Sequence, residues 1–158
     1  MSTTNRRKFL KGGAVVAAAT TAAAVPAAAQ QKPVRKALRA DGKENVVPAG
    51  GKPPRFSAMV SYGNLLFVSG IGYHKEGDVK VHTKAVLEEI KTKLEAAGSS
   101  MEKVLKCNVY LNDLKDYDAM NSVYDGAFGN NPPVRTTIAA AGGIPGNSLV
   151  EIDVIAFI

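Results

Sequence analysis

The sequence lacks several features that common enzyme classes need. It has a single cysteine, Cys107, which excludes a disulfide within the chain. Its two histidines, His74 and His82, have no constellation of cysteines or carboxylates at metal-ligand spacing, so we expect surface histidines and no metal site. The glycines of SGIG and AAAGGIPG do not complete a dinucleotide or phosphate-loop pattern, and we interpret them as turns.

The net positive charge is concentrated at one end of the chain. The net charge is +6, but the first 29 residues supply +4 of it and contain no acid. The remainder carries only +2 and has no aromatic and basic stripe, so nucleic-acid binding is disfavoured. After Lys115 a single cation remains, Arg135.

The first 29 residues also lack the Leu, Ile and Phe content of a membrane span. The segment NRRKFLK precedes a weakly apolar Ala, Thr and Gly stretch that ends in Ala27-Ala28-Ala29. Paired arginines before such a stretch indicate a twin-arginine export signal, and they favour it over a permanent membrane span. We predict a signal peptide at 1–29, cleavage after Ala29, and a mature protein that works in the periplasm or elsewhere outside the cytoplasm.

Residues 30–46 have five cations, few large apolar residues and no clear period, which predicts a basic flexible arm. A short contact with an anionic surface is the alternative. The folded domain is predicted at 47–158.

Periodicity predicts the elements of this domain. We expect a hairpin over 57–70 that turns at Tyr62-Gly63-Asn64. A helix is expected over 83–98, capped by Thr83 and stopped by Gly98, with an apolar stripe of Val86, Leu87, Ile90, Leu94 and Ala97. A strand is expected over 101–111, with Leu105, Cys107, Val109 and Leu111 on one face. A second helix is expected over 112–128, with Asp113 as a candidate cap and an apolar stripe of Met120, Val123, Tyr124 and Ala127. Two strands, at 134–141 and 149–158, close the chain.

This order of elements predicts an α+β fold, a mixed sheet with both helices packed on one face. The other face then has too few elements to cover it, so self-association is the economical solution. Cys107, on an apolar strand face, is interpreted as a buried structural thiol and not as a nucleophile.

Arg135 and Glu151 remain as candidates for chemistry. Both lie near the start of the two closing strands, in segments almost free of other charge. One interpretation is a structural ion pair. The other is an anchor for an anionic ligand, because a guanidinium fits a carboxylate with two parallel bonds, beside a glutamate that handles protons or positions water.

The segments GNLLFVSG, KVLKCNVYLNDLKDYDAMNSVYDGAF, PPVRTTI and VEIDVIA resemble, in order and spacing, the Rid family of YjgF-type reactive-intermediate deaminases. The resemblance covers about 47–158. It implies a chorismate-mutase-like α+β fold, a homotrimer with ligand clefts between subunits, and no metal or organic cofactor. It also implies hydrolysis of 2-enamine or 2-imine acids, such as 2-aminoacrylate, to 2-keto acids and ammonia.

By position, the resemblance implies that Arg135 clamps the substrate carboxylate and that Glu151 orients or activates the attacking water. It places Ser69, Gly70 and Asn121 along the cleft. Three positions depart from the family: Phe56 replaces a common tyrosine, Thr137 a common cysteine, and Ile71 the usual glutamine. A non-catalytic trimer that binds small carboxylates or acts like a chaperone is therefore the alternative, and an RNA-directed activity is a more distant one.

Overall fold

The computed structural model describes residues 32–158, which form one compact unit, Lys32–Ile158. The predicted signal peptide lies outside the described residues. In chain order the elements are β1 (Arg35–Leu38), β2 (Met59–Tyr62), β3 (Leu65–Gly72), α1 (Val79–Ala96), η1 (Met101–Lys103), β4 (Val104–Leu111), η2 (Leu114–Asp116), α2 (Tyr117–Tyr124), β5 (Val134–Ala139), η3 (Pro145–Asn147) and β6 (Val150–Phe157), where η marks a short 3₁₀ helix. No helix in this part of the chain is both long enough and apolar enough to cross a bilayer.

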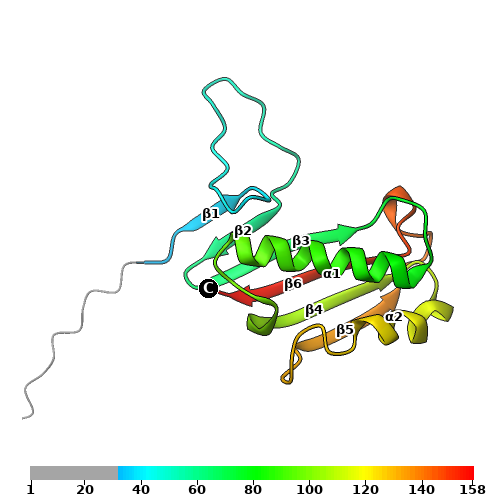
Figure 1. Cartoon of the computed structure of the whole chain (residues 1–158). Helices are drawn as coiled ribbons and strands as arrows, with labels where there is room; N and C mark the ends of the chain where they lie inside the picture. Colours follow the sequence, from blue (N-terminus) through cyan, green and yellow to red (C-terminus); the bar gives the residue numbers. More distant parts are fainter. Residues whose placement is uncertain (1–31) are drawn as a thin grey trace, which may run out of the picture. The chain divides into compact units, whose positions relative to one another are not determined.

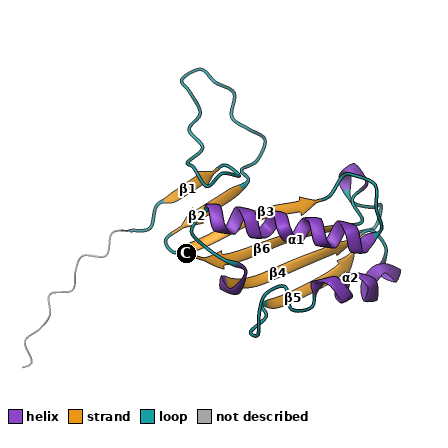
Figure 2. Cartoon of the chain, viewed as in Figure 1, coloured by secondary structure: helices purple, strands orange, loops and turns teal. Residues whose placement is uncertain are grey.

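The described strands form one mixed sheet in the order β1-β2-β3-β6-β4-β5. Every pairing is antiparallel except that of β4 with β5, which is parallel and is connected through α2. Both helices lie on the same side of the sheet (Figures 1 and 2). The predicted α+β fold, with a mixed sheet and two helices on one face, is confirmed.

The core lies between the helices and the sheet. The predicted stripe of α1 is buried there, with Ile90 and Leu94 fully covered, and β6 and β4 contribute the opposing apolar row. Each such side chain stabilises the fold by about 1.5–3 kcal/mol through its burial. The alternation of buried and half-buried residues along β6 shows that only one face of this strand enters the core.

The first helix begins four residues earlier than predicted. Asp78 is its N-cap, with a carboxylate oxygen that accepts a hydrogen bond from the Val81 amide at 2.9 Å. Thr83 is buried inside the helix, where its hydroxyl donates to the Val79 carbonyl at 2.6 Å, so its predicted role as the cap is wrong. Gly98, with φ of 81°, follows the end of the helix as expected.

The second helix is shorter than predicted, because its first turn is the 3₁₀ helix η2. Asp113 caps η2 by accepting a hydrogen bond from the Lys115 amide at 3.0 Å. Met120 and Tyr124 of α2 are buried, and Val123 and Ala127 pack against the core, as the stripe predicted.

The strand predicted at 101–111 also begins later, because Met101–Lys103 is 3₁₀ helix η1. A register shift between Val104 and Lys106 then places Val104 in the core and leaves Leu105 46% exposed. The bulge therefore removes Leu105 from the face that Cys107, Val109 and Leu111 share.

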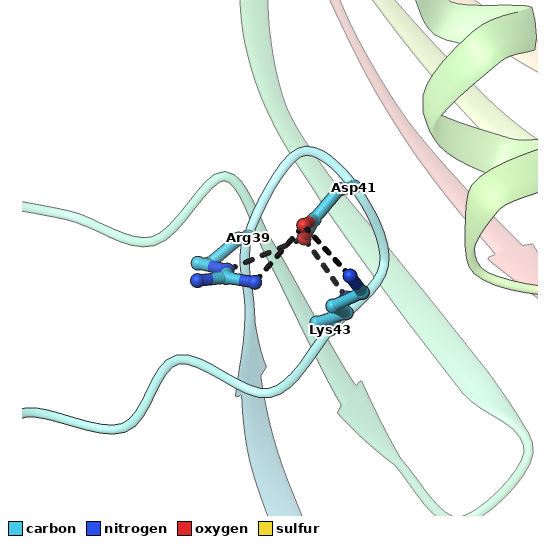
Figure 3. A network of polar contacts seen from close by, with 3 residues as sticks. All are labelled: Arg39, Asp41 and Lys43. Carbon is cyan, nitrogen blue, oxygen red and sulfur yellow. Dashed lines mark hydrogen bonds and ion pairs between the residues drawn. The ribbon is translucent and has the colours of Figure 1, made fainter.

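The predicted basic arm contains a strand, so the prediction of a flexible segment is wrong for Arg35–Leu38. This segment, β1, pairs antiparallel with β2 and forms one edge of the sheet. A tight turn follows, in which Asp41 pairs with Arg39 at 2.9 Å and contacts Lys43 at 4.0 Å (Figure 3). All three side chains are exposed, so these ion pairs add little stability. The backbone pairing of β1 is what orders the segment.

The face of the sheet away from the helices, which we call the open face, carries large apolar side chains. Register places Phe67, Ile155 and Ile138 on it, and Phe67 and Ile138 are 39% and 50% exposed. Asp153 lies in the same face and accepts hydrogen bonds from Asn108 at 2.8 Å and from Tyr110 at 3.0 Å. Self-association was predicted because too few elements would cover this face, and both described helices lie on the other side (Figure 1).

Candidate functional site

Arg135 projects from β5 toward the helix side of the sheet. Its register partner on β4 is Cys107, which is fully buried in the core, so both residues point to the same side. The guanidinium donates to the side-chain oxygen of Asn121 at 2.8 Å and to the Tyr117 hydroxyl at 3.2 Å, and it lies 4.6 Å from the ring centroid of Tyr124. Within residues 32–158 no carboxylate is within ion-pair distance of it.

All the partners of this cation are therefore neutral. Asn121 was predicted to line the cleft, and the structure brings it to Arg135. Tyr117 and Tyr124 were missed, although their spacing of four and three residues from Asn121 places all three on one face of α2. Hydrogen bonds and aromatic faces hold the guanidinium in place without neutralising it, which leaves the charge available for an anion.

Behind Arg135 the site contains buried hydroxyl groups. The oxygens of Tyr124 and Thr137 are both buried and have no hydrogen-bond partner in the structure. Burial raises the pKa of the Tyr124 phenol, so it is neutral and able to donate at physiological pH. Unpaired buried hydroxyls beside a cation are a place where a small polar molecule gains hydrogen bonds.

Cys107 lies next to this cluster and is not a nucleophile. Burial raises the pKa of its thiol to about 11, so the reactive thiolate is absent at neutral pH. The prediction of a buried structural thiol is confirmed.

Glu151 lies on the open face, opposite to Arg135. Its register partners are Tyr110 on β4 and Gly72 on β3, and the residues on either side of it in β6, Val150 and Ile152, are fully buried. The half-buried carboxylate of Glu151 makes no hydrogen bond or ion pair with any described residue. The two residues are also two strands apart in the sheet. Within one chain they do not meet, so the interpretation as an internal ion pair is wrong.

Gly70 makes room for Glu151. A Cβ atom at Gly70 would overlap the Glu151 carboxylate, so any side chain at this position would displace it. Ser69 and Gly70 lie in the irregular part of the β3–β6 pairing, between Val68 and Ile71, where the two strands shift register. Ser69 is half-buried and its amide bonds to the Ala58 carbonyl at 3.0 Å. Ser69, Gly70 and Glu151 thus form a second group of predicted site residues.

Of the remaining positions singled out in the sequence, only Thr137 belongs to one of the two groups. Thr137 lies on the helix side of the sheet with Arg135. The two residues are two positions apart on β5, both are half-buried, and the residues on either side of each are exposed. Phe56 is 73% exposed in the loop before β2, where it lines an open groove of about 500 Å³ with Arg55 and Val60. Ile71 is 3% exposed and belongs to the core.

Both histidines were predicted to lie on the surface, and this prediction is wrong for His82. His74 is exposed, as expected, but His82 is only 2% exposed and its Nδ1 accepts a hydrogen bond from the Leu149 amide at 3.1 Å. No group of three potential metal ligands occurs among the residues that the structure describes.

Comparisons with known proteins find family models, sequences and solved structures that are similar to this chain. The family model for Endoribonuclease L-PSP matches residues 51–158, and the model for the twin-arginine translocation pathway signal sequence matches residues 3–23. A RutC family protein of Pyrococcus horikoshii is 39% identical over 109 residues, which cover 65% of this chain and 86% of that protein.

Two solved structures are similar over most of their own length. A member of the YjgF protein family from Neisseria meningitidis is 32% identical, with a TM-score of 0.61, and the match covers 67% of this chain and 89% of that one. The yeast protein YEO7 is 27% identical, with a TM-score of 0.67, and the match covers 78% of this chain and 98% of that one.

Proposed function

Since the chain belongs to the Endoribonuclease L-PSP family, which includes the YjgF and RutC proteins, we propose that it hydrolyses reactive 2-enamine and 2-imine acids to 2-keto acids and ammonia. It does so as a homotrimer, after export by the twin-arginine pathway. The observation that carries the proposal is a half-buried guanidinium, Arg135, that is held by neutral groups only. This is the chemistry of a carboxylate clamp.

The trimer supplies the second half of the site. Arg135 and Glu151 lie on opposite faces of one sheet, so a single chain cannot present both to one small substrate. In the proposed trimer, the open face of one subunit meets the β5 edge of the next. Glu151, Ser69 and Gly70 of one subunit then face Arg135, Asn121 and Thr137 of its neighbour. The apolar open face supports this assembly.

The reaction requires little beyond positioning. A 2-enamine acid first tautomerises to the 2-imine, whose carbon is electrophilic. Arg135 holds the carboxylate, and Glu151 accepts a proton from water as the oxygen attacks that carbon. The tetrahedral intermediate receives that proton on nitrogen. Its new hydroxyl group gives a second proton to nitrogen as the carbon–nitrogen bond breaks, and ammonia and the 2-keto acid leave. One water is consumed and no electrons are exchanged.

The test uses 2-iminobutanoate released in situ by a threonine dehydratase. The mature protein is expected to accelerate 2-oxobutanoate release. Arg135→Ala is expected to abolish both this rate and binding of 2-oxobutanoate. Glu151→Gln is expected to reduce kcat about a hundredfold, with a much smaller change in binding. Lys91→Ala removes an exposed cation on α1 and serves as the matched control.

Three outcomes would contradict the proposal. Binding of 2-oxobutanoate without any acceleration would favour a non-catalytic carboxylate-binding trimer, the alternative that Phe56 and Thr137 suggest. Equal losses of rate and binding in Glu151→Gln would refute the water-positioning role. An Arg135→Ala protein that unfolds or dissociates would indicate a structural role for the cation.

A further inference from the structure

The segment that leads into Glu151 is fixed by a histidine that the proposed reaction does not use. Residues 145–149 comprise η3 and the two residues that join it to β6, and Leu149 lies two residues before Glu151. The Leu149 amide donates to Nδ1 of His82 at 3.1 Å, across from the first turn of α1. His82 is 2% exposed, so water does not compete for this bond.

This bond specifies the chemical form of the imidazole. A backbone amide is always a donor, so Nδ1 of His82 must carry a lone pair and the ring proton must lie on Nε2. The Tyr73 ring packs edge-on against the imidazole, with 5.2 Å between ring centroids and an interplanar angle of 81°, which limits rotation of the ring. The structure therefore requires the neutral Nε2–H form of His82.

Neighbouring contacts depend on the same segment. The Ser148 hydroxyl accepts a hydrogen bond from the Tyr73 amide at 2.9 Å and donates to the Val150 carbonyl at 2.7 Å. Ser148 and Val150 are both fully buried. Val150 directly precedes Glu151, so the His82 bond belongs to a connected set of anchors for the residue that carries the carboxylate.

We infer that His82 is a positioning residue for Glu151, in its neutral form with Nδ1 as acceptor. The inference rests on the proposed function, in which the Glu151 carboxylate must hold a water at one place. Protonation of Nδ1 would place two donors against each other and release Leu149. His82 thereby makes the position of Glu151 sensitive to acid.

The charged surroundings of His82 are mixed. The other titratable and charged side chains near it are His74, Lys75 and Glu76, which line the same cavity of about 370 Å³, Tyr73 in the ring contact, and Asp78 at the start of α1. The segment 145–149 contributes none. Lys75 and Glu76 have opposite charges, so their electrostatic effects on this cavity partly cancel.

The test compares two substitutions in the mature protein with the 2-iminobutanoate assay. His82→Asn places an amide oxygen where Nδ1 lies and cannot be protonated in this range, whereas His82→Leu removes the acceptor. At pH 8, His82→Asn is expected to keep kcat within about twofold of the wild type, while His82→Leu loses about tenfold in kcat with KM nearly unchanged. Lys91→Ala, at an exposed position of the same helix, is the control, because His74 itself bonds to the Gly146 carbonyl of this segment at 3.0 Å.

The pH profile separates positioning from folding. As the pH falls from about 8 to about 5, the wild type and Lys91→Ala are expected to lose rate more steeply than His82→Asn. Long-range proton–nitrogen spectra are expected to show Nδ1 of His82 without a proton at neutral pH, whatever the activity. If His82→Leu does not fold, the pH profile of His82→Asn and the spectra of the wild type still test the inference.

Two results would overturn the inference. One is an acid limb in His82→Asn as steep as in the wild type, and the other is a proton on Nδ1 at neutral pH. If Glu151→Gln keeps full rate, the proposed function fails at Glu151 whatever His82 does. If Glu151→Gln is impaired and the His82 variants are not, only the positioning role fails.

Discussion

At the scale of residues, the environment of Arg135 determines what it can bind. An arginine paired with a carboxylate has little attraction left for an anion, whereas one held by an amide, a hydroxyl and an aromatic face keeps its charge. The sequence shows that few other charged residues surround Arg135 in the chain, but it does not show which side chains contact the guanidinium. Those partners come from α2, which the parallel pairing of β4 with β5 places beside it.

Cys107 gives a prediction about stability at high pH. Burial raises the pKa of its thiol from 9.0 to about 11 in the folded protein. The unfolded chain therefore loses this proton first, and the free energy of unfolding should fall as the pH rises from about 9 toward about 11. We expect a loss of about 2–3 kcal/mol by the end of this range. Urea unfolding of the wild type at successive pH values measures it.

Cys107→Ala is the control for this effect, because it removes the thiol, while burial, the main cause that raises the pKa of the Tyr124 phenol, remains. Its stability should decline less steeply between about pH 9 and 11. Parallel declines in the two proteins would contradict a buried, neutral thiol.

At the scale of elements, periodicity predicted what lies against the core, and it failed where local geometry intervenes. The buried stripes of α1 and α2 followed from apolar spacing, because burial alone sets that pattern. Leu105 was misplaced because one bulge inverts the alternation of a strand. β1 was missed because its residues are mostly exposed, so they show no apolar pattern in the sequence. Backbone pairing with β2 is what orders this strand.

The start of α1 gives a prediction that separates two candidate caps. Asp78→Ala should destabilise the protein by about 1 kcal/mol, because the Val81 amide loses its acceptor. Thr83→Val preserves the shape of the buried side chain and removes only a hydroxyl bond to a helix carbonyl, so it should be nearly neutral. Urea unfolding at neutral pH measures both. A larger cost for Thr83→Val would restore Thr83 as the stabilising residue.

At the scale of the whole molecule, the two halves of the candidate site face in opposite directions. The residues of each half could be named from the family resemblance, but their separation could not, since it depends on which strands pair and in which register. The register of β6 with β4 places Glu151 beside Tyr110, and that of β4 with β5 places Arg135 beside Cys107. These non-local pairings leave no local signal in the sequence.

This arrangement predicts complementation between two inactive proteins. Arg135→Ala and Glu151→Gln, each inactive alone, are unfolded together and refolded as mixed trimers at equal amounts. A site that combines Arg135 of one subunit with Glu151 of the next then has both native residues in about a quarter of cases, so about a quarter of wild-type activity should return. Refolding each variant separately and then mixing the two is the control. If each subunit held a complete site, no activity would return.

The position of β5 at the margin of the sheet has a consequence for motion. This strand has a neighbour on one side only, β4, and most of its residues are exposed, whereas β6 is bonded on both sides and alternately buried. Edge strands open locally at a lower free energy than central ones. The proposed carboxylate clamp, Arg135, therefore lies on one of the strands whose amides should exchange fastest in the free subunit. A bound 2-keto acid would slow that exchange, so the strand would become fully ordered when the site is occupied.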